Sequence, residues 1–256
     1  MHMVNDWFLD VGHGGIDSGA INAYIKEKDI NLIVGLEIGK ILQLNGQNVK
    51  YSRTTDVSVD LNNRAPMANS WGADYFVSIH HNAGGGNGLE IIHSIHGGVG
   101  KNLAEFMAPI VSKGTGQNIR RVYSKKGNSG NDYYAVIRDS KMPAIIIEYG
   151  FIDNPEDYKL FDTKPELLLE AKYIATACLN FIGITNIKYG DEIPIPEVIK
   201  KSKYFSDIPD NHWSIDNLDR AKEIGLIFGT GSGKIGFSEE LARTITFILR
   251  GIDLKK

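Results

Sequence analysis

Short apolar runs alternate with segments of helical periodicity from residue 8 to residue 182, and this alternation restricts the fold more than any other feature of the chain. The apolar runs predict strands at 8–11, 49–52, 75–79, 89–94 and 144–147, and the periodic segments predict helices at 27–44, 61–71, 103–111 and 166–182. Strands that alternate with helices form mainly parallel sheets. The sequence therefore predicts an α/β domain with helices on both faces of the sheet.

The chain is long enough for a medium-sized domain and a small one, since its 256 residues exceed the roughly 150 of one typical domain. Residues 186–203 contain Pro194, Pro196 and several lysines without a sustained apolar period, which is typical of a linker. The expected organisation is a domain at 1–185, a linker at 186–203 and a small, mainly helical module at 204–256.

Composition excludes several classes of protein. The formal net charge of −3 argues against nucleic-acid binding through phosphate neutralisation. The single Cys178 excludes a cysteine-cluster metal site. No apolar run approaches the ~18 residues of a membrane span, and the first residues lack the pattern of a secretion signal. We therefore expect no nucleic-acid partner and no membrane span. If the protein acts outside a cell, we expect either that it accumulates in the cytoplasm and is then released, or that its secretion signal is missing from this chain.

Polar residues with metal-binding chemistry follow the predicted strands. His13 follows the first strand, His80 follows the strand at 75–79, and Glu148 follows the strand at 144–147. Ligands bind at this edge of parallel sheets. Glu27 begins the first helix and reaches the same edge only if the loop after His13 folds back. Two imidazoles and a carboxylate form a catalytic zinc set with a position open for water, and a second carboxylate can transfer the proton.

Each of these assignments has an alternative when the residues are taken alone. A histidine in a glycine-rich loop, such as His13, often serves the turn. Glu27 at a helix start complements the helix dipole. His80 and His81 point to opposite faces of a strand, so only one can reach a given ion, and periodicity does not say which. Glu148 is less ordinary, because a carboxylate that ends a buried strand is costly unless it is paired or functional.

Ordered motifs cover nearly all of residues 5–183. They are Leu9–Gly15 with Asp17, Glu27-Lys28 with Asn31, Arg53 with Asp56, Arg64, Ser78–Asn82, and Met142–Phe151 with Asn154. Together these motifs resemble the zinc-dependent N-acetylmuramoyl-L-alanine amidases, the type 3 amidase domain of cell-wall hydrolases. The resemblance implies a mixed, mostly parallel sheet.

The resemblance also implies a function. In the family pattern His13, Glu27 and His80 bind Zn²⁺, His81 is not a ligand, and Glu148 is the catalytic glutamate. The expected reaction is hydrolysis, at the bacterial cell wall, of the peptidoglycan amide between the lactyl group of N-acetylmuramic acid and L-alanine. Two alternatives are a zinc peptidase that cuts the stem peptide and an inactive wall-binding adaptor.

The C-terminal part resembles one surface-layer homology (SLH) module. The matching residues are Phe205–Pro209, Trp213, Ala221, Gly225–Ile227, Gly229, Gly231, Gly233 and Phe237. The tract that contributes to polymer recognition in that family is degraded here to Ala242–Ile245. The resemblance implies a secondary cell-wall polymer as partner; the alternative is that Trp213, Leu218 and Ala221 are only core residues. A catalytic domain followed by a wall-binding module is similar to an endolysin, with an autolysin as the other expectation.

Overall fold

The computed structural model describes residues 4–190 and ten residues nearer the C-terminus, which are 218, 219, 221, 222, 236, 238, 241, 242, 244 and 245. The chain divides into two compact units, Met1–Gly190 and Asp191–Lys256. The predicted linker beyond residue 190 and most of the predicted module at 204–256 lie outside the described residues, so both stay predictions. Leu218, Ala221 and Ala242 are described and are fully buried.

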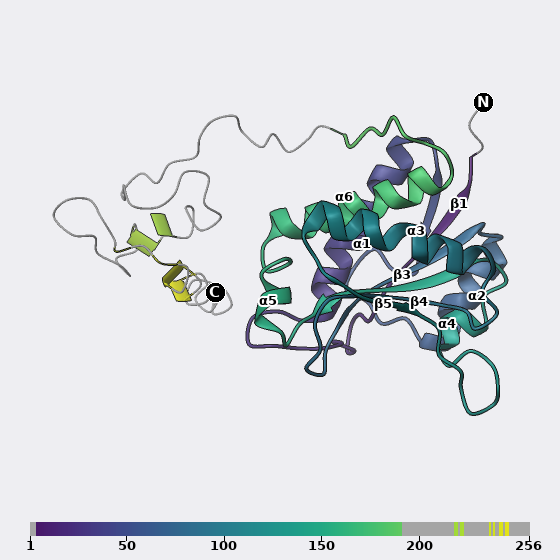
Figure 1. Ribbon diagram of the computed structural model, residues 1–256, viewed down its shortest axis with the longest axis horizontal. Coiled ribbons are helices and arrows are strands. Elements are labelled where there is room, and N and C mark those ends of the chain that lie inside the picture. Colours follow the sequence, from purple (N-terminus) through teal and green to yellow (C-terminus); the bar gives the residue numbers. More distant parts are fainter. Residues whose placement is uncertain are drawn as a thin grey trace. The chain divides into compact units, whose positions relative to one another are not determined.

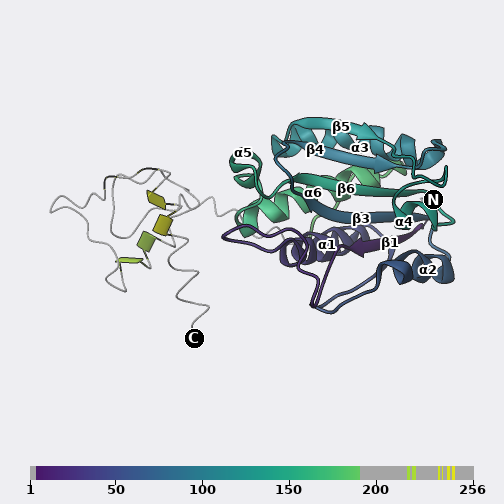
Figure 2. The same cartoon turned by 90° about the horizontal axis from the view of Figure 1, so that it is seen from below.

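A six-stranded sheet forms the centre of the first unit, with the strand order β2-β1-β3-β6-β4-β5. Figure 2 shows β1, β3, β6, β4 and β5 side by side in that order. All neighbouring strands are parallel except β4 and β6, which are antiparallel. The prediction of a mixed, mostly parallel sheet is therefore confirmed. The strands are β1 (Asp6–Val11), β2 (Asn48–Tyr51), β3 (Tyr75–Asn82), β4 (Leu89–His93), β5 (Ile119–Tyr123) and β6 (Ala144–Phe151).

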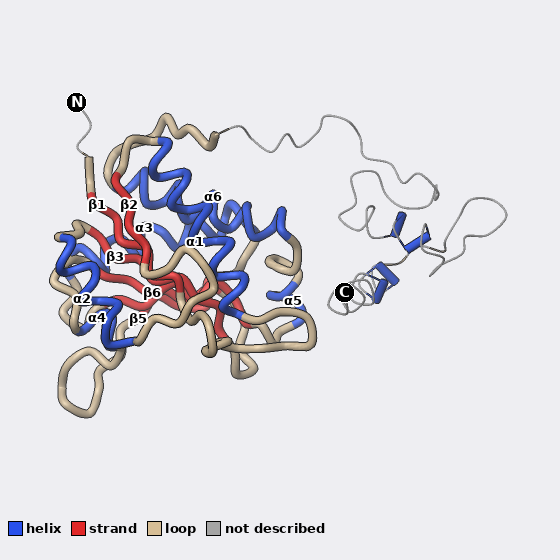
Figure 3. The backbone as a smooth tube through the Cα atoms, turned by 180° about the vertical axis from the view of Figure 1, so that it is seen from behind, coloured by secondary structure: helices blue, strands red, loops and turns tan. Residues whose placement is uncertain are grey.

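Helices cover both faces of this sheet, as predicted (Figure 1 and Figure 3). The helices α1, α3 and α6 pack on one face, and α2 and α4 pack on the other. Among the described residues, no helix combines the length and the apolar character that crossing a membrane requires. The helices are α1 (Glu27–Leu44), α2 (Leu61–Trp71), α3 (Gly98–Thr115), α4 (Ala135–Arg138), α5 (Pro155–Tyr158) and α6 (Lys164–Phe181).

The central strands divide their side chains between two buried clusters. On β3, Val77 and Ile79 join the larger cluster beneath α1, α3 and α6, whereas Phe76 joins the smaller cluster against α2 and α4. On β6, Ile145 and Ile146 divide in the same way. Successive residues on a strand face opposite sides of the sheet, so this division fixes which layer each polar residue further along β3 and β6 must face.

Two strands and one helix continue past their predicted last residues. The strand at 75–79 continues to Asn82 and the strand at 144–147 continues to Phe151, because β3 and β6 stay paired through His80 and Glu148. His80 and Glu148 therefore lie within strands and not after them. The helix predicted at 103–111 spans Gly98–Thr115 with Pro109 inside it. A proline costs an interior helix one hydrogen bond, and the buried apolar face of α3 offsets that loss.

Candidate metal centre

The loop after β1 turns sharply and carries His13. Its φ of 59° is a left-handed conformation that residues other than glycine rarely adopt, and such strain is often retained at functional sites. Gly14 and Asp17 exchange backbone hydrogen bonds of 2.9 and 3.1 Å that close the turn. The Asp17 carboxylate lies 2.8 Å from Nδ1 of His13, which occupies that nitrogen and leaves Nε2 for another partner.

Two buried arginines donate hydrogen bonds to the backbone of this loop. Nη2 of Arg53 donates to the Gly12 carbonyl at 2.9 Å, and Nη2 of Arg64 donates to the His13 carbonyl at 3.1 Å. Nη1 of Arg64 also pairs with the buried Asp10 carboxylate at 2.7 Å. Buried guanidinium groups need such partners, so both arginines fix the backbone that presents His13.

Glu27 begins α1, and its buried carboxylate is the centre of a hydrogen-bond network. The loop after His13 does fold back, because the Glu27 N–H donates to the Ala20 carbonyl at 2.9 Å. Oε2 accepts from the Ala20 N–H at 2.8 Å. Oε1 accepts from Nδ2 of Asn31 at 3.2 Å and from the His81 N–H at 3.1 Å. These contacts hold both carboxylate oxygens toward the edge of the sheet.

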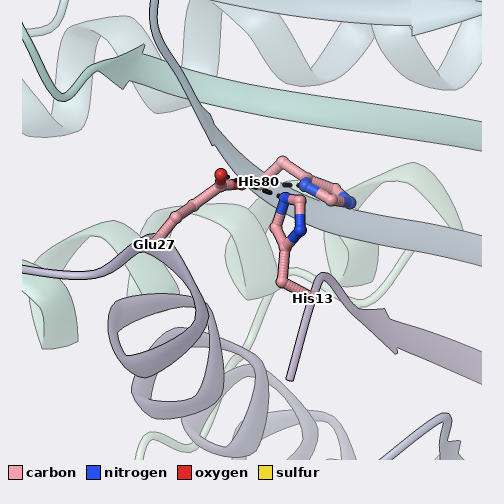
Figure 4. A group of neighbouring side chains, drawn as sticks. All are labelled: His13, Glu27 and His80. Carbon is pink, nitrogen blue, oxygen red and sulfur yellow. Dashed lines mark hydrogen bonds and ion pairs between the residues drawn. The ribbon is translucent and has the colours of Figure 1, made fainter. Parts of the chain in front are cut away.

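The structure brings His13, Glu27 and His80 together (Figure 4). Nε2 of His13 lies 3.0 Å from Oε2 of Glu27, and Nδ1 of His80 lies 2.8 Å from Oε1 of the same carboxylate. One donor atom from each residue lies within 4.8 Å of the other two. Three segments that are distant in sequence therefore converge on a space of the size that one ion requires.

His81 faces the opposite side of the sheet. Its Nε2 lies 3.2 Å from Oε2 of Glu170 on α6, and its Nδ1 lies 2.9 Å from Oδ1 of Asn31. The side chains of His81 and Glu170 are both fully buried. The side chain of His81 is therefore not part of the group of three. It contributes indirectly, because it contacts Asn31, and Asn31 donates a hydrogen bond to the Glu27 carboxylate.

Two glycines leave the space that these side chains occupy. A Cβ on Gly12 would lie 2.3 Å from Cε1 of His80, and a Cβ on Gly19 would lie 2.5 Å from Oε2 of Glu27. Neither approach is sterically possible without displacing the imidazole or the carboxylate. The glycine-rich loop is therefore shaped around the donor atoms, in addition to forming a turn.

Glu148 lies next to this group, in register with His80 on the adjacent strand β6. Burial raises the pKa of Glu148 to about 7, and the negative charges of Glu27 and Glu90 act in the same direction, while His80 opposes them. A carboxyl group that titrates near neutral pH can both accept and deliver a proton under ordinary conditions. The geometry therefore places a carboxyl group with a near-neutral pKa beside the three donor atoms.

Glu90 belongs to the same area and was not predicted. It lies opposite Glu148 in the antiparallel pair of β4 and β6, with 2% of its surface exposed. Nε of Arg120 and Nε of Arg121 lie 2.8 and 3.0 Å from its Oε1. The signal was present in the sequence, because a glutamate inside the apolar strand at 89–94 carries the same cost as Glu148 at the end of its strand. Glu90 and Glu148 both line a cavity of about 460 Å³, together with Arg121 and Tyr123 of β5.

The charges of the three convergent residues depend on one another. Burial opposes ionisation of Glu27, but contacts with two imidazoles hold its pKa well below the usual range. Burial would lower the pKa of His80, but Glu27 outweighs it and raises the value to about 9. A pair of imidazole nitrogens with one carboxylate is the donor set of catalytic zinc sites that have three protein ligands. The residues present therefore fit a zinc ion, whose binding would release the imidazole protons.

Comparison with known sequences gives one family. A family model described as N-acetylmuramoyl-L-alanine amidase matches residues 8–180. The amidase CwlM of Bacillus licheniformis is 40% identical over 154 residues, which cover 59% of this chain and 58% of that protein. The endolysin of Bacillus phage SPP1 is 36% identical over 156 residues, which cover 60% of this chain and 57% of that protein. The chain thus spans less than two thirds of the length of these relatives.

Solved structures share the fold. The catalytic domain of CwlV from Bacillus (Paenibacillus) polymyxa var. colistinus has a TM-score of 0.63 and 28% identity, covering 71% of this chain and 99% of that chain. The amidase AmiC2 of Nostoc punctiforme has a TM-score of 0.63 and 29% identity, covering 70% of this chain and 97% of that chain. Because the family model covers more than half of the sequence, the chain belongs to the N-acetylmuramoyl-L-alanine amidase family.

Proposed function

We propose that this protein hydrolyses peptidoglycan at the amide that joins the lactyl group of N-acetylmuramic acid to L-alanine. The observation that carries the proposal is the convergence of His13, Glu27 and His80 beside Glu148 in a chain of this amidase family. The name of the relative CwlM, N-acetylmuramoyl-L-alanine amidase, supports the same reaction. Such an enzyme separates the stem peptide from the glycan and leaves the sugar chain intact.

We further propose that His13, Glu27 and His80 hold a zinc ion. When bound, zinc supplies Lewis-acid chemistry, which polarises the scissile carbonyl and lowers the pKa of water to about 7. The chain orients the ligands: Asp17 engages Nδ1 of His13, and Asn31 donates to the Glu27 carboxylate. Contacts of this kind fix the tautomer and the direction of a metal ligand.

Glu148 is the proposed acid and base. Its carboxylate accepts the proton of the attacking water, and the resulting carboxylic acid delivers a proton to the departing nitrogen of L-alanine. An amide nitrogen leaves poorly without that proton, so its delivery matters as much as activation of the water. Burial and the neighbouring carboxylates, which raise the pKa of Glu148 to about 7, suit it to both directions of transfer.

The cell wall is the proposed place of action, with residues 204–256 as an SLH-like module that binds a secondary cell-wall polymer. Similarity to the endolysin of phage SPP1 supports an endolysin, and similarity to the bacterial amidase CwlM supports an autolysin. Co-sedimentation of the full chain with purified walls, before and after the polymer is extracted, tests the module. Equal sedimentation with both wall preparations would exclude polymer binding.

Mass spectrometry of the fragments released from purified peptidoglycan tests the proposed reaction. We expect new amino groups on L-alanine, no new reducing sugar ends, loss of release after chelation and recovery with zinc. New amino groups inside the stem peptide would identify a zinc peptidase instead. Absence of any release by the zinc-loaded chain would indicate an inactive wall-binding adaptor.

A further inference from the structure

The cavity next to Glu148 contains more polar and basic groups than proton transfer requires. Its volume is about 460 Å³, and β5 and the chain after it contribute Arg121, Tyr123 and Lys125 to its lining. Tyr134 completes this side, with its hydroxyl 3.0 Å from the hydroxyl of Tyr123. The cavity therefore combines cationic groups, hydroxyl groups and aromatic surface.

Positive charge in this cavity is only partly compensated. Arg121 and Lys125 are the basic residues of the lining, and Glu90 and Glu148 are its carboxyl groups. The Glu90 carboxylate does not balance Arg121 alone, because Arg120, which lies outside the lining, shares it. Glu90 engages Nε and Nη2 of Arg121, and within the described part of the chain the Nη1 donors have no recorded partner. The ammonium group of Lys125 lies 3.8 Å from the ring centroid of Tyr133, and no carboxylate of the described residues pairs with it.

The strand register places this charge on one side of the reacting group. His80, Glu148, Glu90 and Arg121 are neighbours in a single row across β3, β6, β4 and β5. The convergent donors lie on one side of Glu148, and the cavity lies on the other. If Glu148 delivers a proton to the departing nitrogen, the departing peptide lies at the cavity side of the row.

Resting on the proposed amidase function, we propose that this cavity is the subsite for the peptide half of the substrate and that Arg121 and Lys125 bind a carboxylate of that peptide. The sugar half of the substrate carries no charge next to the scissile amide, whereas the stem peptide is acidic. A guanidinium and an ammonium group select a carboxylate over a neutral amide, because hydrogen bonds to ionised acceptors are the stronger ones. The subsite therefore distinguishes substrates with a free acid from those in which it is amidated.

Lys125 is the residue that tests the subsite most cleanly. Arg121 also holds Glu90, so its removal would disturb a second group, whereas Lys125 is exposed and pairs with no described carboxylate. Lys126 is a matched control, since it carries the same charge one residue further along and does not line the cavity. The three full-length proteins to compare are the unchanged chain, Lys125→Ala and Lys126→Ala.

Calorimetric titration with a soluble probe measures binding without any need for hydrolysis. The probes are L-alanyl-D-glutamate with its γ-carboxyl group blocked as the methylamide, so that the α-carboxylate of the second residue is its one carboxylate, and L-alanyl-D-isoglutamine blocked in the same way. We expect the acid to bind more tightly than the amide to the unchanged chain. Lys125→Ala should raise the dissociation constant of the acid about fivefold, as expected for one exposed charge contact, and leave that of the amide unchanged. Lys126→Ala should leave both constants unchanged.

Equal affinity of Lys125→Ala and the unchanged chain for the acid would overturn the subsite. An equal loss in both lysine variants would also overturn it, because it would reflect general surface charge. Hydrolysis assays separate this result from the proposed function. A chain that cleaves the amide yet fails the titration pattern retains its function and lacks the subsite. A chain that passes the titration and cleaves nothing has an acidic-peptide site without the amidase activity.

Discussion

Glu148 lies directly across from His80, on adjacent parallel strands of the sheet, so one cross-strand pair joins the Glu148 carboxyl group to the convergent donor atoms. Neighbouring strands are about 4.8 Å apart, which brings the two side chains within reach of one substrate bond. A rigid sheet, and not a mobile loop, therefore sets the distance between the two parts of the site. The predictions below depend on this pairing.

Replacing Glu148 with glutamine should separate catalysis from metal binding. Glu148→Gln keeps the shape of the side chain and removes proton transfer, so we expect activity to fall about 10²–10⁴-fold with zinc content unchanged. Turbidity loss of purified walls and metal analysis of the same preparation check this. Glu105→Gln on the exposed side of α3 is the control, and activity of Glu148→Gln near that of the control would remove Glu148 from the mechanism.

The same substitution should change stability in a pH-dependent way. The pKa of Glu148 is raised to about 7 from an unfolded value near 4.5, so the folded chain disfavours the ionised form. Stability of the metal-free protein should therefore be lost as pH rises from about 4.5 to 7. Glu148→Gln should escape this loss and be more stable at pH 8 by up to about 3 kcal/mol, with no difference at pH 4.5.

Hydrogen exchange of peptides from β3 and β6, in the presence of a chelator, measures this difference locally. At pH 8 we expect the amides of these peptides to exchange more slowly in Glu148→Gln than in the unchanged protein, after correction for intrinsic rates. The same protection in both proteins at every pH would mean that ionisation of Glu148 carries no folding cost.

Replacing His80 should reduce zinc affinity, whereas replacing His81 should reduce the stability of the fold. His80→Ala removes a donor atom, so we expect zinc affinity to fall by more than about 100-fold. His81→Ala keeps the donors but leaves Glu170 buried without its partner, which should cost about 3–5 kcal/mol of unfolding free energy. Competition with a chromophoric chelator and urea unfolding measure the two effects. His81→Gln, which retains a hydrogen-bond donor, is the milder variant, and zinc loss there but not in His80→Ala would reverse the assignment.

A methyl group on Gly12 should damage the site more than the fold. In Gly12→Ala the new Cβ would lie 2.3 Å from the His80 ring, so the imidazole must move away from Glu27. We expect zinc affinity to fall at least about tenfold. Gly46→Ala is the control, because its φ of 79° imposes backbone strain with no atom within 4 Å of the new Cβ. Equal zinc affinity in both variants would show that Gly12 does not shape the site.

Much of the fold could be predicted from the sequence because the strands of the parallel core are continuous apolar runs. The strand at 144–147 is buried on both faces and stands out as such, and helix 27–44 has a regular apolar period. The edge strand β5 could not be found this way. Ile119, Arg120 and Arg121 are exposed, and Val122 and Tyr123 alone pack against the buried clusters, so the sequence has no apolar run long enough to predict a strand.

The candidate site could be predicted only in part. Parallel strands end at one edge of the sheet, so the sequence predicts that His13, His80 and Glu148 lie close together. The choice between His80 and His81 depends on which layer each strand position faces, and that is a tertiary property. Ile79 packs in the cluster beneath α1, so the next residue, His80, faces the opposite side of the sheet. Alternation along the strand does not by itself say which residues face which layer.

Anomalous diffraction at the zinc edge, from crystals of the full chain grown with zinc, tests the central claim most directly. We predict a single strong peak between His13, Glu27 and His80, on the side of the group that faces Glu148. A peak at another place in the molecule, or none between these three side chains, would contradict the proposed metal centre and the hydrolysis that depends on it.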